Sequence, residues 1–297
     1  NLVGTSVMKT SILVIGGAGF VGSNLCLKLS LDTSNKVYSL DNYFTGTKEN
    51  HVDNVKYIQG SSCDIFKLID FKVDILFHLG EYSRVEESFN DIKLVYEYNK
   101  KGTYNVLEFV KEKKCKLIYS GSSTKFGDKG KNITESPYAW SKSSNVDLIK
   151  NYHKWFKIDY AITYFYNVYG RYEIESGKYA TLIGIYKYCM KQNLPLKIVK
   201  PGFQKRYFTH IDDIVEGLII VAKKGFGDKY GIGSNDCYSV EEIAQLFGGK
   251  IVYIPERKGN RMDTDLVTDK SRQLGWKPRK KIKDYITSLK LNNWIDV

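Results

Sequence analysis

Short apolar runs alternate with helical patterns through the first half of the chain. The runs are rich in β-branched and aromatic residues, as buried strands are. They cover residues 11–16, 35–40, 54–59, 73–79, 115–120 and 159–166. Between them, residues 93–112 and 138–156 have the spacing of apolar side chains that is typical of amphipathic helices. Strands that alternate with helices in this way predict an α/β fold with a doubly wound parallel sheet.

The regular alternation of strands and helices ends after Gly170, which indicates a smaller C-terminal lobe. An aromatic helix is expected at 181–192 and a short strand at 196–199. Two better defined helices follow at 211–224 and from Ser239, with Asp212 and Asp213 expected to cap the first. We expect a cofactor-binding domain over residues 8–169, joined by about 205–235. The substrate-binding lobe then comprises 170–204 and 236–297.

Composition narrows the class of protein. The 297 residues contain no apolar run long enough for a membrane span and no secretory signal, and we leave residues 1–7 out of the fold. Five scattered cysteines without a CxxC pair indicate neither a disulfide framework nor a metal site, so a cytoplasmic location is expected. The net charge of +12 comes from dispersed lysines, which favours a solvated surface and anionic small substrates over nucleic acid.

A glycine-rich turn stands between the first predicted strand and the first helix. Gly16, Gly19 and Gly22 let backbone N–H groups and a helix N-terminus approach a pyrophosphate. Asp41 ends the second strand 19 residues after Gly22, where a carboxylate binds the adenosine ribose. The carboxylate would repel a 2′-phosphate, so this Rossmann-type pattern predicts NAD rather than NADP. A turn-capping role is the alternative for Asp41, and also for Asp64, which is placed to reach the adenine.

The segment SPYAWSKSS places Tyr138 four residues before Lys142 in a predicted helix. This spacing puts the phenol and the ammonium on one helical face. A phenol gives up its proton near neutral pH only with strong electrostatic help, and a lysine beside it provides part of that help. In isolation the pair would suit a solvated helix surface, but after a dinucleotide turn it indicates a catalytic base.

These elements together resemble the extended short-chain dehydrogenase/reductase family, the NAD-dependent nucleotide-sugar epimerases and dehydratases. The resemblance runs from Ile12 to about Pro278 and includes HLGEYSRVEES, NKKGTYNVLE, YNVYG, QKRYFTHIDDIVEG and ERKGN. It implies that Ser122 hydrogen-bonds the reacting sugar oxygen, that Tyr138 is the general base and that Lys142 binds the nicotinamide ribose. The cofactor residues that it implies are Gly16, Gly19, Phe20, Val21, Gly22, Asp41, Asn42, Asp64, Ile65, Leu79, Asn99, Tyr138 and Lys142.

The neighbours of Ser122 narrow the reaction that the resemblance implies. Family dehydratases carry an acidic pair after this serine and decarboxylases carry a glutamate, whereas this chain has Ser123 and Thr124. Oxidation of a sugar hydroxyl, most often at C4, remains. A nucleotide-sugar 4-epimerase leads, and a net 4-dehydrogenase of a nucleoside-diphosphate hexose or heptose is the alternative. Glu81 and Tyr82 replace the small residues common in the epimerases, and either narrow the space for sugar rotation or bind an extra hydroxyl.

The resemblance also implies the substrate contacts. Arg206 and Arg257 match positions that clamp the diphosphate, Asn167 matches a substrate-binding asparagine, and Arg84 is a further candidate. A homodimer is expected from the family alone. A non-catalytic member that binds RNA or protein is the hypothesis from another class, and the intact Ser122, Tyr138 and Lys142 set argues against it. The nucleotide base and the sugar stay open.

Overall fold

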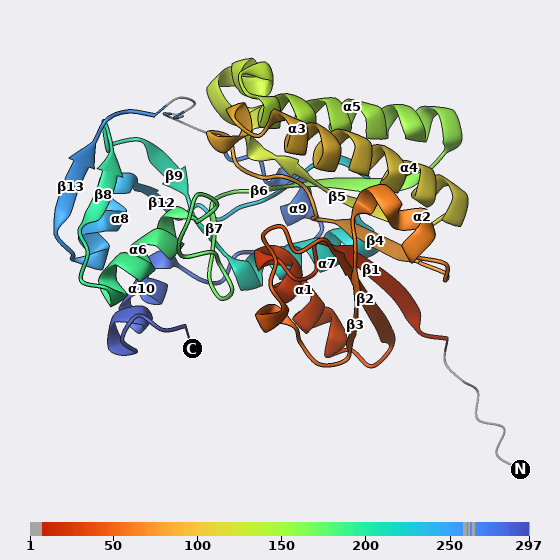
Figure 1. Ribbon diagram of the computed structural model, residues 1–297, viewed down its shortest axis with the longest axis horizontal. Coiled ribbons are helices and arrows are strands. Elements are labelled where there is room, and N and C mark those ends of the chain that lie inside the picture. Colours follow the sequence, from red (N-terminus) through yellow and green to blue (C-terminus); the bar gives the residue numbers. More distant parts are fainter. Residues whose placement is uncertain (1–7, 258–259, 261, 263–264, 297) are drawn as a thin grey trace, which may run out of the picture.

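A seven-stranded parallel sheet forms the centre of the protein (Figure 1). The computed structural model describes residues 8–257, 260, 262 and 265–296. The strand order is β11-β6-β5-β4-β1-β2-β3, and adjacent strands pair in parallel. The strands are β1 (Thr10–Ile15), β2 (Asn35–Asp41), β3 (Val55–Gln59), β4 (Ile75–His78), β5 (Lys116–Ser122), β6 (Asp159–Phe165) and β11 (Gly227–Ile232). This arrangement confirms the predicted doubly wound sheet.

Helices cover both faces of the sheet, because successive side chains of each strand point to opposite faces. Leu13 and Ile15 of β1 pack into one apolar core and Ile12 and Val14 into the other. The helices of the first core are α2 (Ile65–Leu68), α4 (Gly102–Lys113) and α5 (Pro137–Phe156); those of the second are α1 (Phe20–Ser30) and α7 (Ile211–Lys224). Short turns of helix are η1 (Lys48–Asn50), η2 (Ser62–Asp64), η3 (Glu87–Phe89) and η5 (Ser123–Thr134).

The helix expected at 93–112 contains a wider turn. It begins as α3 (Ile92–Val95), passes through the π-helical segment η4 (Tyr96–Lys101) and continues as α4. A π turn inserts residues into a helix and changes which side chains face its partner. Here it turns Asn99 into the protein, where the side chain is fully buried.

The C-terminal lobe has its own apolar core, which includes Tyr186, Leu196, Phe247 and Ile286. It lies beside the sheet domain in Figure 1. Its elements are β7 (Val168–Tyr169), α6 (Leu182–Lys191), β8 (Leu196–Val199), β9 (Lys205–Tyr207), β10 (Thr209–His210), β12 (Cys237–Ser239), α8 (Val240–Phe247), β13 (Ile251–Ile254) and α10 (Ile282–Leu291), while α9 (Asp269–Gln273) packs near β11. The chain returns to the main sheet through α7 and β11.

The starts of two helices show how local sequence sets an element. Ser239 and Glu242 form a reciprocal capping box at α8, as expected. The prediction for α7 was wrong, because His210 is its N-cap and its Nδ1 accepts the N–H of Asp212 at 3.0 Å. The carboxylate of Asp213 instead accepts N–H groups of the segment before α10, at Arg279 and Lys280.

Candidate active site

The glycine turn after β1 is built for close backbone approach. Gly16 has a φ of +84°, which favours glycine. A Cβ on Gly22 would lie 1.9 Å from the carbonyl oxygen of Gly16, so no larger residue fits there. The N-cap of α1 is Gly19, and no side chain caps its first turn. The free N–H groups of that turn and the helix dipole suit a pyrophosphate, so these residues fit NAD.

Asp41 braces the same turn from the end of β2. Its Oδ2 accepts the N–H of Ala18 at 2.9 Å and its Oδ1 accepts the N–H of Tyr43 at 2.8 Å. Burial raises the pKa of Asp41, and the two backbone hydrogen bonds oppose the rise. The carboxylate therefore has the predicted turn-capping contact as well as a place beside the cofactor cleft.

One cavity brings together the glycine turn and the catalytic candidates. Its volume is about 440 Å³, and Gly16, Ser122, Tyr138 and Lys142 all line it. Other predicted residues that line it are Gly19, Phe20, Val21, Gly22, Leu79, Glu81, Arg84 and Asn167. An adjoining recess is lined by Asp41, Asn42 and Tyr82, together with residues that sequence reasoning missed: Phe44, Gly60, Ser62 and Tyr98.

Asp64 and Ile65 do not line either of these two spaces. The carboxylate of Asp64 forms an ion pair with Lys67 at 3.1 Å and is half-exposed. Ile65 is fully buried in the apolar core. The neighbouring Gly60 and Ser62 face the recess at the end of β3 instead, at the carboxyl edge of a parallel sheet where ligands bind.

Ser122 is the last residue of β5 and its hydroxyl lies in a polar turn. Thr124 donates its hydroxyl to the Oγ of Ser122 at 2.9 Å, and the backbone N–H of Thr124 is 3.3 Å from the same oxygen. Ser122 and Thr124 are both buried, and both line the main cavity. The two positions after Ser122, where family dehydratases are expected to have acids, are thus Ser123 and Thr124, which have hydroxyl groups.

Tyr138 and Lys142 lie on the first turns of α5. Ser136 caps this helix by accepting the N–H of Ala139 at 3.0 Å, and Pro137 takes the first position. The ammonium of Lys142 donates to the carbonyl of Ser120 and to the Oε1 of Glu81, the latter at 2.9 Å. The cap thus starts the helix at the point that turns both side chains toward the cavity.

The polar groups of Glu81 and Tyr82 are hydrogen-bonded to other protein side chains. The carboxylate of Glu81 is buried against Lys142. The hydroxyl of Tyr82 donates to Asp91 at 2.8 Å, and burial raises the pKa of Tyr82. Asn99 holds the backbone N–H and carbonyl of Tyr82, at 2.7 and 3.0 Å. Asn99 therefore shapes the loop after β4 and does not line the cleft.

Of the predicted substrate contacts, Arg84 and Asn167 line the main cavity, whereas Arg206 and Arg257 lie outside it. Arg84 lines the cavity and its Nε donates to the carbonyl of Tyr179 at 2.9 Å. Asn167 also lines it and donates to the carbonyl of Tyr207 at 3.0 Å. Arg206 and Arg257 do not line it; Arg257 forms an exposed pair with Glu86 at 3.3 Å. Residues 258 and 259 of the predicted phosphate segment lie outside the described residues.

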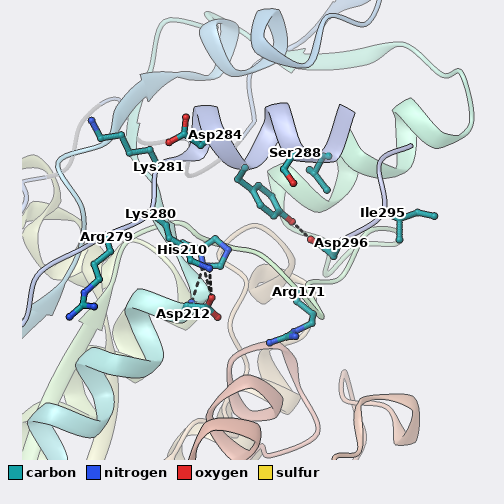
Figure 2. A pocket seen from close by; sticks show the side chains of 12 residues that line it. Arg171, His210, Asp212, Arg279, Lys280, Lys281, Asp284, Ser288, Ile295 and Asp296 are labelled. Atoms are coloured by element: carbon teal, nitrogen blue, oxygen red, sulfur yellow. Dashed lines mark hydrogen bonds and ion pairs between the residues drawn. The ribbon is translucent and has the colours of Figure 1, made fainter. Parts of the chain in front are cut away.

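A second cavity, of about 330 Å³, contains none of the candidate residues (Figure 2). It lies between the start of α7 and α10. Some of its charges are paired: Lys280 meets Asp212 at 2.5 Å, and the carboxylate of Asp296 meets Lys187 at 2.8 Å. Burial lowers the pKa of His210 to about 4, so this ring is neutral at physiological pH. The catalytic candidates and the glycine turn both line the first cavity.

The described ranges also bear on two other expectations. Within them, no three or more His, Cys, Asp or Glu side chains are grouped to hold a metal ion. In the same part of the chain, every helix is too short or too polar to cross a membrane.

Comparisons with known proteins show the family of this chain. Residues 12–233 match the NAD dependent epimerase/dehydratase family. A putative UDP-glucose 4-epimerase of Methanocaldococcus jannaschii is 29% identical over 96% of this chain and 98% of its own. A dTDP-D-glucose 4,6-dehydratase of Homo sapiens is 28% identical over 90% of this chain and 85% of its own.

Solved structures show the same fold. A UDP-glucose 4-epimerase of Thermotoga maritima with UDP-glucose superimposes with a TM-score of 0.86 at 25% identity, over 93% of this chain and 96% of its own. A Thermus thermophilus UDP-glucose 4-epimerase in complex with NAD gives 0.85 at 22%, over 96% of this chain and 99% of its own. The chain therefore belongs to the NAD-dependent epimerase/dehydratase family, and it is an enzyme that uses NAD.

Proposed function

We propose that this enzyme oxidises C4 of a nucleoside-diphosphate sugar and acts as a 4-epimerase. The observation that carries the proposal is that Ser122, Tyr138 and Lys142 line one cavity with the glycine turn. A cavity of about 440 Å³ also has a size suited to small-molecule ligands.

Each catalytic side chain has a role that follows from its chemistry. Tyr138 removes the proton from the C4 hydroxyl, and Ser122 hydrogen-bonds the same oxygen and positions it. Lys142 supplies positive charge near the phenolate and a donor for the nicotinamide ribose. NAD, when bound, supplies the hydride acceptor for C4. The hydroxyl of Thr124 holds the Oγ of Ser122 at 2.9 Å and so helps to orient it.

The chemistry around Ser122 supports an oxidation without elimination. Removal of water from a keto sugar needs an acid and a base beside the leaving group. Ser123 and Thr124 are hydroxyl residues, and both line the cavity where a dehydratase of this family has its acids. Similarity to both epimerases and dehydratases fits this, because the two reactions share the first oxidation.

A net 4-dehydrogenase is the second candidate, and Glu81 favours it, because its side chain takes up space in the main cavity beside Lys142. The ring of Tyr82 lies between Phe44 and Tyr179, with ring centroids 6.3 and 5.9 Å away, and narrows the adjoining recess beside Asp41. An epimerase needs room for the keto sugar to turn over before hydride returns. Neither Glu81 nor Tyr82 offers an unpaired polar group to an additional sugar hydroxyl.

The proposed substrate is anionic, and Arg84 is the arginine nearest to this role. It lines the cavity, and its planar guanidinium can bind a diphosphate oxygen. Arg206 and Arg257 would have to move to reach the substrate. We also propose a cytoplasmic location, in keeping with a sugar-nucleotide substrate, and no nucleic-acid partner.

A homodimer is part of the proposal. The face formed by α3, η4, α4 and α5 carries large apolar side chains in contact with solvent, which would be covered by a second copy. They include Ile92, Tyr96 and Tyr104, which are 60, 61 and 51% exposed, and Trp155, which is 56% exposed. Light scattering during size-exclusion chromatography should give twice the chain mass, and Tyr104→Glu should give the monomer mass.

The test of function is turnover of a panel of UDP-, GDP- and ADP-linked hexoses and heptoses. Near-ultraviolet absorbance follows reduced nicotinamide, and the sugar is then analysed for its configuration. An inverted C4 without accumulating NADH identifies an epimerase, and stoichiometric NADH identifies a dehydrogenase. A 4,6-dehydrated product would refute the proposed reaction.

A further inference from the structure

Glu81 is a buried carboxylate in direct contact with the catalytic lysine. Its side chain is 3% exposed and that of Lys142 is 7% exposed. The Oε1 of Glu81 lies 2.9 Å from the Nζ of Lys142. Its Oε2 accepts from Asn145 at 3.0 Å and from the hydroxyl of Thr103 at 3.3 Å. Three groups from two helices thus fix this carboxylate in place.

The hydrogen bonds of Lys142 limit what its ammonium can still do. An ammonium has three N–H donors. One is directed to the carbonyl of Ser120 and one to Glu81. One donor is left for the cavity, where the nicotinamide ribose is expected. Glu81 therefore fixes the direction of that donor and also compensates the positive charge of Lys142.

The groups packed around Glu81 do not compensate its charge in place of Lys142. His78 of β4 is fully buried, and burial lowers its pKa to about 4, so it is neutral. Tyr119 of β5 is also buried, and burial together with the Glu81 charge raises its pKa. Lys100 of η4 donates to the Oδ1 of Asn145 at 2.7 Å; burial lowers the pKa of Lys100, and its attraction to Glu81, which acts without an ion-pair contact, partly opposes this. Arg84 lies in the same loop; its guanidinium hydrogen-bonds the carbonyl of Tyr179, and its charge acts on Tyr138 in both the free and the NAD-bound protein.

We propose that Glu81 is a positioning residue that fixes the ammonium of Lys142 and partly compensates its charge, so that loss of the phenolic proton of Tyr138 is coupled to the binding of oxidised NAD. The inference rests on the proposed role of Tyr138 as the base. A Lys142–Glu81 ion pair stabilises a nearby phenolate less than an uncompensated ammonium does. The positive charge of the oxidised nicotinamide then provides the missing part, and cofactor binding and loss of the phenolic proton become coupled.

Calorimetry tests this coupling without a sugar substrate. NAD is titrated into nucleotide-free protein at several pH values, in buffers of different ionisation enthalpy, which gives the protons released on binding. The proton release that depends on Tyr138 is the number of protons released by the wild type minus the number released by Tyr138→Phe. Plotted against pH, this difference should pass through a maximum, because the phenol is protonated in both the free and the NAD-bound protein at low pH and ionised in both at high pH.

Glu81→Gln should move that maximum toward acid by about one pH unit, because it removes one negative charge a few ångströms from Lys142. The acid limb of the kcat/KM profile should move in the same direction. Glu108→Gln is the matched control: Glu108 binds Tyr152 and Lys111 on the outer side of α4, and its loss should leave the maximum in place.

Moving the carboxylate from position 81 to position 145 should reverse the effect of Glu81→Gln. Asn145 lies 3.0 Å from Glu81, so the double variant Glu81→Gln, Asn145→Asp returns a carboxylate to the same cluster. Its maximum should return toward the wild-type pH. Should Glu81→Gln fail to fold, Glu81→Asp, whose shorter side chain withdraws from Lys142, should show a smaller acid shift.

The outcomes separate this inference from the proposed function. A folded Glu81→Gln that binds NAD with its maximum at the wild-type pH would overturn the inference. Absence of any Tyr138-dependent proton release in the wild type would overturn it too. Failure of the whole sugar panel, with the shift present, would instead refute the proposed substrate class and leave the role of Glu81 standing.

Discussion

Replacement of Gly22 by alanine tests whether the glycine turn is as tightly built as the structure shows. The added Cβ would lie 1.9 Å from the carbonyl oxygen of Gly16, 2.7 Å from its carbonyl carbon and 2.9 Å from the Cα of Gly17. All three are backbone atoms, so no side-chain rotation relieves the contact. The first separation has to grow to at least 3.0 Å, and the turn or α1 must move by more than 1 Å to allow it.

The loss in free energy of unfolding caused by Gly22→Ala can be estimated. Overpacking of this kind lowers the free energy of unfolding by about 1–3 kcal/mol. The better helix propensity of alanine offsets up to about 1 kcal/mol. The net loss of about 1–2 kcal/mol corresponds to a decrease in melting temperature of about 2–6 °C for a chain of this size. Displaced N–H groups should also weaken NAD binding by at least about tenfold, the equivalent of one charge-assisted hydrogen bond.

Differential scanning calorimetry and NAD titration measure the two effects. Gly19→Ala is the control for stability, because its nearest neighbour is the Gly16 carbonyl oxygen at 3.4 Å and its φ is −84°. Alanine is a poorer N-cap than glycine, so a small decrease is expected, and Gly19→Ala should melt closer to the wild type than Gly22→Ala does. A Gly22→Ala variant that melts and binds NAD like the wild type would refute the tight turn.

Three further predictions concern single side chains. Tyr138→Phe should abolish turnover, since the phenol is proposed to act on the sugar, while calorimetry should still detect NAD binding, with an affinity that no longer gains from ionisation of the phenol as the pH rises. Asp41→Asn should lower the ratio of NAD to NADP affinity by at least about tenfold, because the carboxylate that repels a 2′-phosphate is lost; an unchanged ratio would contradict this role. Burial raises the pKa of Asp228, but hydrogen bonds from Lys125, Lys150 and Tyr164 outweigh it and bring the pKa to about 2. A depressed carboxyl pKa stabilises the fold above the unfolded value and loses that effect as pH falls, so wild-type stability should drop by about 2 kcal/mol between pH 4 and 2 in urea titrations. Asp228→Asn should lack this part of the drop, and an equal drop in both proteins would contradict the assignment.

Much of the fold could be predicted because the relevant signals are local. Buried parallel strands read as short apolar runs, and β2 and β6 match their predicted ranges to within a residue. The helix from Pro137 begins at the predicted place because a serine cap and a proline mark it. The π turn at 96–101 was not predictable, since its cause is the packing of Asn99 against the loop of Tyr82.

The site shows the same division. The glycine turn, Asp41, Ser122, Tyr138 and Lys142 have fixed positions relative to strand ends, so a motif can predict that they lie near one another; Asp41 lines the recess that adjoins the cavity of the others. Glu81 was expected either to narrow the space for sugar rotation or to bind an extra hydroxyl; it lines the cavity, and its contact with Lys142 was not foreseen, although a buried carboxylate needs a cation. The direction of a side chain in an irregular loop depends on partners from other elements, here α5. Local sequence does not contain that information.

Transfer of a label from C4 to the cofactor shows directly whether the enzyme oxidises this carbon. The substrate found in the sugar-nucleotide panel is prepared with deuterium at C4, and the wild-type enzyme with bound NAD is quenched within one turnover for mass analysis of the nicotinamide. If Tyr138 and NAD oxidise C4, the reduced cofactor of the wild type contains deuterium and that of Tyr138→Phe contains none. Unlabelled reduced cofactor from the wild type, with deuterium retained in an oxidised sugar, would show oxidation at another carbon and contradict the account.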